Sequence, residues 1–338
     1  MTSLVLTVTE TLRYRGALGQ WSWVLHRISG LGVVLFLTLH IVDTSWAVFY
    51  PQLYVEAIAT YQSPLFTLGE FGLVACVIYH ALNGLRIIVI DYKPMWWKYQ
   101  QKAAVYVLIG TAVILVPVFI LMFGHVLNFY NDPEHKILGL GEVLAAQLPF
   151  AVGIALAIVA AVVLSGLYGL IAPKPTVPVK TAKPHGSKIE RFWWSYMRIS
   201  GILIVPLVFG HLAIMHIIQG VFDITAVGHT VVGTSAVNAS GTSVEFVANR
   251  WNALIAGVAI WRLYDFGMLA LVVVHGFNGL RLVLTDYTNF SPMMKRAAVY
   301  LCVIGAAILL TLGILALLST IDSSAIKIAE QTAATLHQ

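Results

Sequence analysis

Cysteine and charge are both scarce in this chain. Of its 338 residues only two are cysteine and 10% are charged, whereas soluble domains carry about 25% charged residues. Cys76 and Cys302 both lie in apolar runs, which excludes a disulfide framework and a cysteine-ligated metal site. The low charge excludes a soluble domain. The N-terminus lacks a small-residue cleavage site behind a short apolar region, so we expect no cleaved signal peptide.

Apolar residues are abundant instead. They make up 59% of the chain, and the mean hydropathy is +0.85. A helix needs ~20 apolar residues to cross a ~30 Å hydrocarbon layer, and seven runs meet this requirement. They lie near residues 24–49, 68–91, 103–127, 143–171, 198–220, 264–286 and 297–319. The sequence therefore predicts an all-α, polytopic transmembrane helical bundle.

Lysine and arginine gather in alternate connections between these runs. Of the 20 such residues, those expected on the opposite side are Lys136, Arg250, Arg262 and Lys327. By the positive-inside rule, we predict a multi-pass protein of the cytoplasmic (inner) membrane, with the N-terminus in the cytoplasm and the C-terminus outside. The net charge of +5 is thereby explained by topology, and we expect lipid rather than nucleic acid as a partner.

The chain contains an internal repeat. The segment His80 to Arg86, followed by Asp91-Tyr92, returns as His275 to Arg281, followed by Asp286-Tyr287. In the same way Arg27-Ile28-Ser29-Gly30 returns as Arg198-Ile199-Ser200-Gly201, and that offset also relates His40 to His211. A unit of three helices is therefore used twice, with both copies parallel about an axis along the membrane normal.

This repeat divides the chain into three parts. Residues 1–130 form the first three-helix repeat and residues 191–338 the second. Residues 131–190 supply one return helix, Glu142 to Ile171, and a Pro- and Lys-rich linker. The polar segments 50–68 and 221–263 are too broken to span, and we expect parts of them to form short amphipathic helices at the interface.

Four histidines are paired by the repeat: His40 with His211, and His80 with His275. An ionisable residue at bilayer depth is costly and indicates function. Neutral imidazole is a common metal ligand, and two imidazoles can hold a haem iron inside a helical bundle. Two matched pairs predict two haems, and the alternative is that the histidines are satisfied core residues.

Two glycines and two arginines follow the histidines of the second helices, and each pair allows two interpretations. Gly84 and Gly279 lie one turn beyond His80 and His275, where they make room either for a flat macrocycle or for a helix contact. Arg86 and Arg281 either meet haem propionates or extend to the membrane interface.

Polar residues also gather at the cytoplasmic ends of the helices. They are His26, Arg27, Ser29, Arg198, Ser200, Asp286 and Tyr287. A quinone needs hydrogen-bond donors for its carbonyls and a proton source on reduction, and these side chains supply both. The alternative is a ring of interfacial anchors.

Arg-x-Ser-Gly at the start of a first helix, and His-x-x-x-Gly-x-Arg followed by Asp-Tyr at the end of a second, resemble the cytochrome b membrane-anchor subunits of succinate dehydrogenases and fumarate reductases. The resemblance covers both repeats. His26-Arg27-x-Ser29-Gly30 resembles the large anchor subunit, and His275 with Asp286-Tyr287 resembles the small one. It implies the two anchors fused in one chain, as a di-haem subunit of succinate:quinone oxidoreductase (respiratory complex II) that performs no catalysis alone.

The resemblance also implies roles for particular residues. His80 and His275 are the expected ligands of an inner haem b iron, and His40 and His211 those of an outer one. Around the haems we expect His26, Arg86 and Arg281. The quinone, menaquinone or ubiquinone, is expected near Trp23, Arg27, Ser29, Arg198, Asp286 and Tyr287. The expected partners are a flavoprotein subunit and an iron–sulfur subunit on the cytoplasmic face.

The sequence departs from the family pattern at two positions. Trp23 stands where the family often has a serine, and Met197 stands where the first repeat has His26. Two other functions stay open. One is another di-haem, quinone-linked cytochrome b, since His26 and His40 have the spacing of two haem ligands on one helix. The other is a secondary transporter with parallel repeats, although Pro117 and Pro206 do not occupy matching positions.

Overall fold

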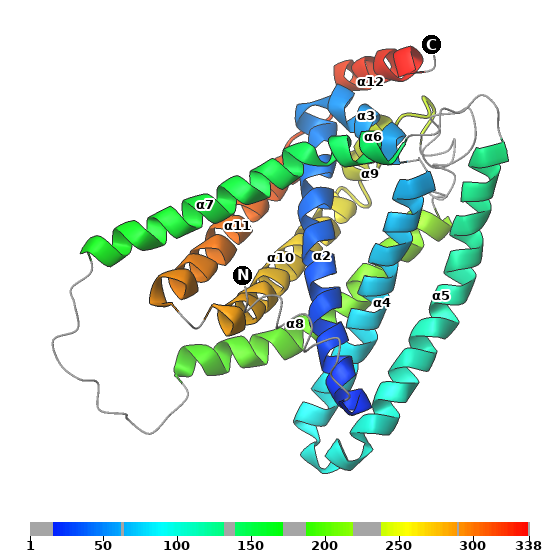
Figure 1. Ribbon diagram of the computed structural model, residues 1–338. Coiled ribbons are helices and arrows are strands. Elements are labelled where there is room, and N and C mark those ends of the chain that lie inside the picture. Colours follow the sequence, from blue (N-terminus) through cyan, green and yellow to red (C-terminus); the bar gives the residue numbers. More distant parts are fainter. Residues whose placement is uncertain are drawn as a thin grey trace.

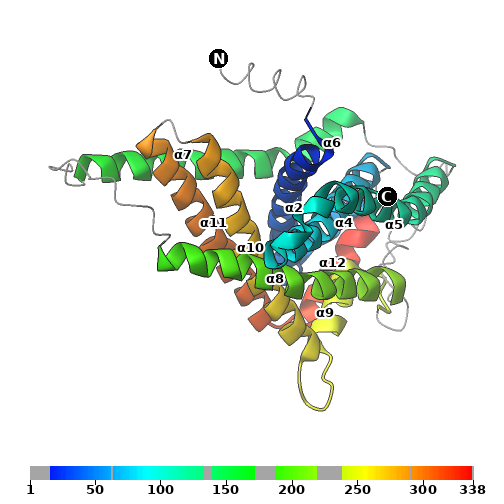
Figure 2. The ribbon, with the colours of Figure 1, turned by 90° about the horizontal axis from the view of Figure 1, so that it is seen from below.

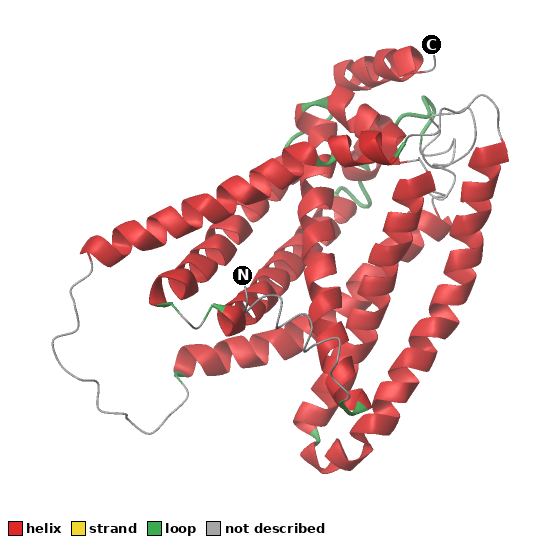
Figure 3. Ribbon diagram, in the orientation of Figure 1, coloured by secondary structure: helices red, strands yellow, loops and turns green. Residues whose placement is uncertain are grey.

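The computed structural model describes residues 16–61, 64–131, 139–171, 187–218, 238–288 and 291–336. Within these ranges the chain forms helices and loops and no named strand (Figures 1 and 3). Seven of the described helices are long and apolar enough to cross a membrane. The predicted fold class, a polytopic helical bundle, is confirmed.

All of the described spanning helices except α7 (Leu148–Ile171) begin before the apolar runs predicted for them. The spanning helices are α2 (Leu18–Phe49), α4 (Pro64–Tyr92), α5 (Gln100–Asn131), α7, α8 (Lys188–Leu212), α10 (Ile260–Tyr287) and α11 (Pro292–Leu318). A short 3-10 helix, η1 (Pro94–Tyr99), precedes α5, and α8 continues as a π-helix, η2 (Ala213–Ile218). These helices begin earlier because polar and aromatic residues continue a helix into the interface, where hydropathy falls.

Four helices form a closed ring at the centre of the molecule. Helix α2 packs against α4 and α10, and α8 packs against the same two helices. Helix α5 lies on α4, and its repeat equivalent α11 lies on α10 (Figures 1 and 2). Small residues permit the close approach that drives association in lipid: a Cβ atom on Gly276 of α10 would lie 3.2 Å from Val34 of α2. The four repeat-paired histidines all lie on this ring.

The fourth predicted run is not one helix. It is divided into α6 (Leu140–Ala146) and α7, with a break at Gln147. Pro149 explains the break, because it has no N–H to donate to the Ala145 carbonyl four residues earlier and its ring clashes with that carbonyl. Helix α7 packs on α11 outside the central ring, where Ser165 Oγ donates a hydrogen bond to the Met293 carbonyl at 2.6 Å.

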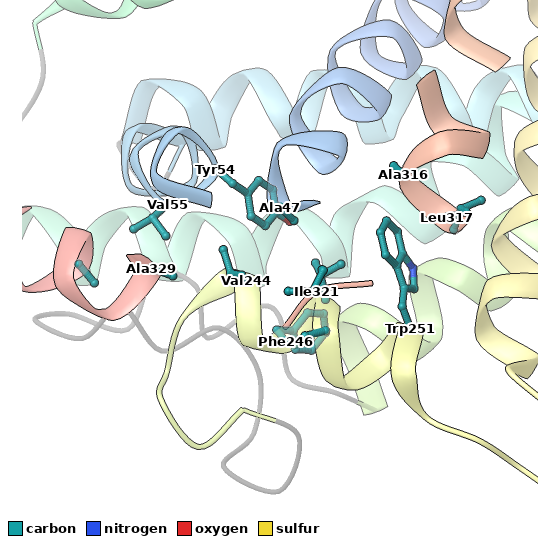
Figure 4. Packing of buried hydrophobic residues seen from close by; sticks show 13 residues of the cluster. Ala47, Tyr54, Val55, Val244, Phe246, Trp251, Ala316, Leu317, Ile321 and Ala329 are labelled. Atoms are coloured by element: carbon teal, nitrogen blue, oxygen red, sulfur yellow. The ribbon is translucent and has the colours of Figure 1, made fainter. Parts of the chain in front are cut away.

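Three short helices cover the end of the bundle opposite Arg27, at the top of Figure 1. They are α3 (Pro51–Tyr61), α9 (Ser243–Asn252) and α12 (Ser323–Leu336), and we call them the cap. Ala47, Tyr54, Val244, Trp251 and other buried residues pack between them (Figure 4). Helices α3 and α9 confirm the short helices predicted in segments 50–68 and 221–263, whereas α12 was not predicted.

Candidate functional site

The inner histidines occupy equivalent places in the two repeats. His80 on α4 faces Gly30 on α2, where an added Cβ atom would lie 2.9 Å from His80 Cε1. His275 on α10 faces Gly201 on α8, and there the corresponding distance is 3.6 Å. Each glycine therefore lets an imidazole ring lie directly against the backbone of the neighbouring helix.

A serine contacts each of these rings. Ser200 Oγ lies 2.8 Å from His275 Nδ1 and donates its proton to the Tyr196 carbonyl at 2.6 Å. Ser29 Oγ lies 3.4 Å from His80 Nδ1 and donates to the His26 carbonyl at 3.1 Å. Ser29, which the sequence assigns to a quinone, is thus directed at His80, and Ser200 lies in the equivalent place.

His26 stacks on His80, with ring centroids 4.0 Å apart and planes 9° from parallel. Among the described residues, His26 Nδ1 and the Nε and Nη1 atoms of Arg86 are buried without a hydrogen-bond partner. Buried polar groups are normally paired. These three nitrogen atoms of His26 and Arg86 therefore indicate a place for a hydrogen-bond acceptor.

Arg86 and Arg281 are equivalent in the repeat, but their hydrogen bonds differ because of Ser22. Arg281 Nε donates to Asn278 Oδ1 at 3.0 Å. In the first repeat Asn83 Oδ1 instead accepts from Ser22 Oγ at 2.8 Å, which leaves Arg86 Nε without this partner. Ser22 also contacts the Tyr79 hydroxyl and is buried, so its hydroxyl is directed into the helix interface.

Gly84 and Gly279 each face a side chain on the first helix of their own repeat. A Cβ atom on Gly84 would lie 3.6 Å from His26, and one on Gly279 would lie 3.8 Å from Met197. Positions 26 and 197 are equivalent in the repeat. Each glycine thus has an ordinary van der Waals contact with a side chain at this position, and its two interpretations stay predictions.

The outer histidines face each other across the ring. The centroids of His40 on α2 and His211 on α8 are 6.3 Å apart, and their planes are inclined by 80°. His211 Nδ1 lies 3.9 Å from Asp265, which is held by Arg250 and by Trp251 Nε1. Asp265 was not assigned from the sequence, although the offset that relates His80 to His275 also relates Glu70 to Asp265 and could have found it.

Two ion pairs at the opposite end of the bundle join the repeats. Arg27 of the first repeat pairs with Asp286 of the second, and Arg198 of the second pairs with Asp91 of the first. We call this end the mouth. Asp91 was not assigned from the sequence, although its equivalence to Asp286 was visible there. The two pairs are therefore related by the same pseudo-symmetry as the histidines.

Aromatic side chains lie against both arginines of the mouth. Trp23 lies 3.9 Å from the Arg27 guanidinium carbon, and Trp194 lies 4.0 Å from that of Arg198. Tyr287 is exposed, and Tyr92 contacts Trp194. Trp194 and Tyr92 were also missed, and the repeat relation to Trp23 and Tyr287 could have found them.

The two arginines nevertheless use their donors differently. Arg198 donates to Asp91 from both Nε and Nη2, at 3.0 and 2.5 Å, and to the Trp194 carbonyl from Nη1. Arg27 donates to Asp286 from Nη2. Arg198 is thereby fixed as a clamp between helices, while Arg27 retains donors for another group.

Several expected residues cannot be placed. His135, His185, His229 and His337, the N-terminal residues 1–15 and most of the linker 173–188 lie outside the described residues. These histidines have no repeat partner in the sequence, and no role is predicted for them.

The described helices thus form a transmembrane bundle in which two sequence repeats place paired histidines at equivalent positions. The family model for the succinate dehydrogenase/fumarate reductase transmembrane subunit matches residues 7–119 and 173–315. The chain belongs to this family. The two matched segments correspond to the two repeats, which is consistent with a fusion of two anchor subunits.

Two relatives support this assignment. The chain is 48% identical over 88 residues to the succinate dehydrogenase 2 membrane subunit SdhC of Mycobacterium tuberculosis, covering 26% of this chain and 65% of the relative. It is 32% identical over 99 residues to the succinate dehydrogenase hydrophobic membrane anchor subunit of Halobacterium salinarum, covering 29% of this chain and 75% of the relative. The chain thus spans just under two thirds of the first relative. No solved structure matches it significantly.

Proposed function

We propose that this chain is the haem b-binding membrane anchor of a succinate:quinone oxidoreductase. Its central ring would hold two haems, and its mouth would bind menaquinone or ubiquinone. The observation that carries the proposal is the pair of equivalent histidine sites on one helical ring, in a member of the anchor family.

His40 and His211 would hold the iron of an outer haem. Their ring centroids lie 6.3 Å apart across the ring, and each imidazole would ligate the iron through one ring nitrogen. Asp265 would hold the His211 ring from behind, as outer carboxylates commonly do for ligating histidines.

His80 and His275 would hold a second, inner haem. Haem carries two propionate carboxylates, and the buried, unpartnered nitrogens of Arg86 and His26 are suited to hold such a group. When bound, a haem accepts and releases single electrons. The protein's part is to hold the ligand rings, neutralise the carboxylates and exclude water.

Quinone would bind at the mouth, beside Arg27. The free donors of Arg27 can hydrogen-bond a quinone carbonyl, Trp23 offers an aromatic face, and Tyr287 is an exposed hydroxyl donor. Asp286, also solvent-exposed, can pass protons from water to the reduced quinone. Arg198 would serve this site indirectly, by clamping α8 to α4.

Peripheral subunits would dock at the mouth. We place this end in the cytoplasm by the positive-inside rule, with the N-terminus inside and the C-terminus outside. A flavoprotein and an iron–sulfur subunit would there deliver electrons from succinate in the respiratory chain and tricarboxylic acid cycle. Residues 1–130 and 191–338 would correspond to the large and small anchors.

A haem-to-polypeptide ratio from the pyridine haemochrome, with low-temperature difference spectra, tests the proposal. We expect two b haems in the purified protein. His275→Ala should remove the inner signal and His40→Ala the outer one, each leaving the other in place. His125, which has no repeat counterpart, provides the control variant His125→Ala. Absence of haem in the wild type would overturn the proposal and favour a transporter.

A further inference from the structure

The inner histidines share a contact that the proposed function does not use. Each ring presents Nδ1 to the hydroxyl of a serine, Ser29 or Ser200, on the neighbouring first helix. Both serines are buried, with exposed fractions of 5% and 1%. Since they belong to the two copies of Arg-Ile-Ser-Gly, the contact occurs twice in one chain, in two separate environments.

The direction of these hydrogen bonds follows from their partners. The single proton of the Ser200 hydroxyl is donated to the Tyr196 carbonyl, so its oxygen must accept from His275 Nδ1. His80 Nδ1 lies 3.1 Å from the His26 carbonyl, which can only accept. Both imidazoles therefore carry their proton on Nδ1 and keep the lone pair on Nε2.

We propose that Ser29 and Ser200 are positioning residues that fix His80 and His275 in the Nδ1-protonated form and hold Nε2 toward the iron. The inference rests on the proposed haem site. An acceptor on the outer nitrogen of a ligating histidine fixes the ring and raises its basicity. A more basic ligand stabilises oxidised iron, so the serines lower the potential of the inner haem.

The two serine–histidine hydrogen bonds differ in strength. The Ser200 bond is short, and His275 has no second Nδ1 acceptor among the hydrogen bonds of the described residues. When the Ser29 hydroxyl is removed, His80 Nδ1 still has the His26 carbonyl as an acceptor. We therefore expect Ser200→Ala to shift the inner-haem potential upward, and Ser29→Ala to shift it less in the same direction.

The test measures the potentials of both haems by optical redox measurement, and the inner-haem EPR signal, in the intact complex. Ser200→Thr, which restores a hydroxyl, should return the potential toward that of the wild type. Ser165→Ala is the matched control, because Ser165 is buried and its hydroxyl also donates to a backbone carbonyl, on α7 away from the histidines. The outer haem should not change in any variant.

The outcomes separate the two proposals. A Ser200→Ala complex with full haem content and an unchanged inner potential and EPR signal would overturn this inference and leave the haem assignment intact. An equal shift in Ser165→Ala would overturn it too. Loss of the inner haem alone in Ser200→Ala, restored by Ser200→Thr, would support it. A wild-type chain without inner haem would overturn the proposed function, and ¹⁵N NMR would then test the Nδ1-protonated form of His275 directly.

Discussion

Arg27 and Arg198 are the same residue of the same motif, yet they are held differently. Arg198 is bound by Asp91 at two nitrogens and by the Trp194 carbonyl at the third, whereas Arg27 contacts Asp286 through Nη2. A motif repeated in a sequence thus acquires two roles when the neighbours differ. The difference makes Arg27 the better candidate for a ligand.

This difference gives a prediction at the mouth. Arg27→Gln should raise the KM for quinone roughly 10-fold to 100-fold, because a hydrogen bond from a charged group contributes about 1.5–3 kcal/mol. Arg198→Gln is the comparison: it should lower thermal stability and change the quinone KM much less. Steady-state assays of the assembled complex measure both, and equal KM effects in the two variants would contradict the assignment.

Many residues of the candidate site were predictable from the sequence, because the internal repeat shows which residues recur at equivalent positions. The repeat identified His40, His80, His211 and His275. It could not show that Ser29 faces His80, or that Asp265 supports His211, because those contacts depend on how neighbouring helices are rotated. Ser22 illustrates this limit: only its packing against Asn83 shows why Arg86 keeps unpartnered nitrogens.

At the scale of the elements, helix contacts at glycine determine where the histidine rings lie. Gly30 of α2 gives the closest such contact, since a Cβ atom would lie 2.9 Å from His80 Cε1. An added methyl group at this distance would overlap the His80 ring, so the ring or the helix must shift. Helix spans were predictable from hydropathy, whereas these contacts depend on packing. The break at Gln147 was missed, although Pro149 is visible in the sequence.

Gly30→Ala should therefore displace the His80 ring. We expect a changed or lost inner-haem spectrum with an unchanged outer one, and a destabilisation of about 1–3 kcal/mol, as is typical of overpacking. Gly72→Ala on α4 is the control, because a Cβ atom there would have no neighbour within 4 Å. A normal inner spectrum in Gly30→Ala would show that the helices adjust to the added methyl group.

The cap helix α9 has a pH-sensitive start. Burial alone would raise the pKa of Glu245, but hydrogen bonds from Ser240 and the neighbouring backbone outweigh it and lower the pKa. The folded state thus favours the carboxylate. Its contribution to stability is complete above the ordinary carboxyl pKa and is lost as the pH falls through the lowered value.

Hydrogen exchange of the α9 amides measures this effect. Protection should be constant near neutral pH and should decrease under acidic conditions. Glu245→Gln should have lower protection near neutral pH and a weaker dependence on pH. An identical profile in the variant would show that another group controls the cap.

At the scale of the whole molecule, the two repeats hold each other by reciprocal contacts. Arg27 reaches from the first repeat to Asp286 of the second, and Arg198 reaches back to Asp91. Helix α2 also packs on α10, and α4 on α8. The repeats are therefore joined by their own interface as well as by the chain between Ile171 and Lys188.

A chain cut between Ile171 and Lys188 should still assemble. We expect the two co-expressed fragments to co-purify with both haems, measured by affinity capture of one fragment. Adding Arg27→Gln and Arg198→Gln should reduce co-purification of the cut chain more than it reduces the yield of the intact chain, because the covalent link supplies a high effective concentration. Equal losses in both forms would show that the ion pairs serve the fold of each repeat.

His26 breaks the symmetry of this arrangement, since Met197 stands in its place in the other half. A true homodimer would present two identical halves at the mouth. The fused chain presents one half with an imidazole beside the arginine and one half without it. Any protein that docks across both halves would therefore meet two different surfaces, and its two orientations would differ in free energy.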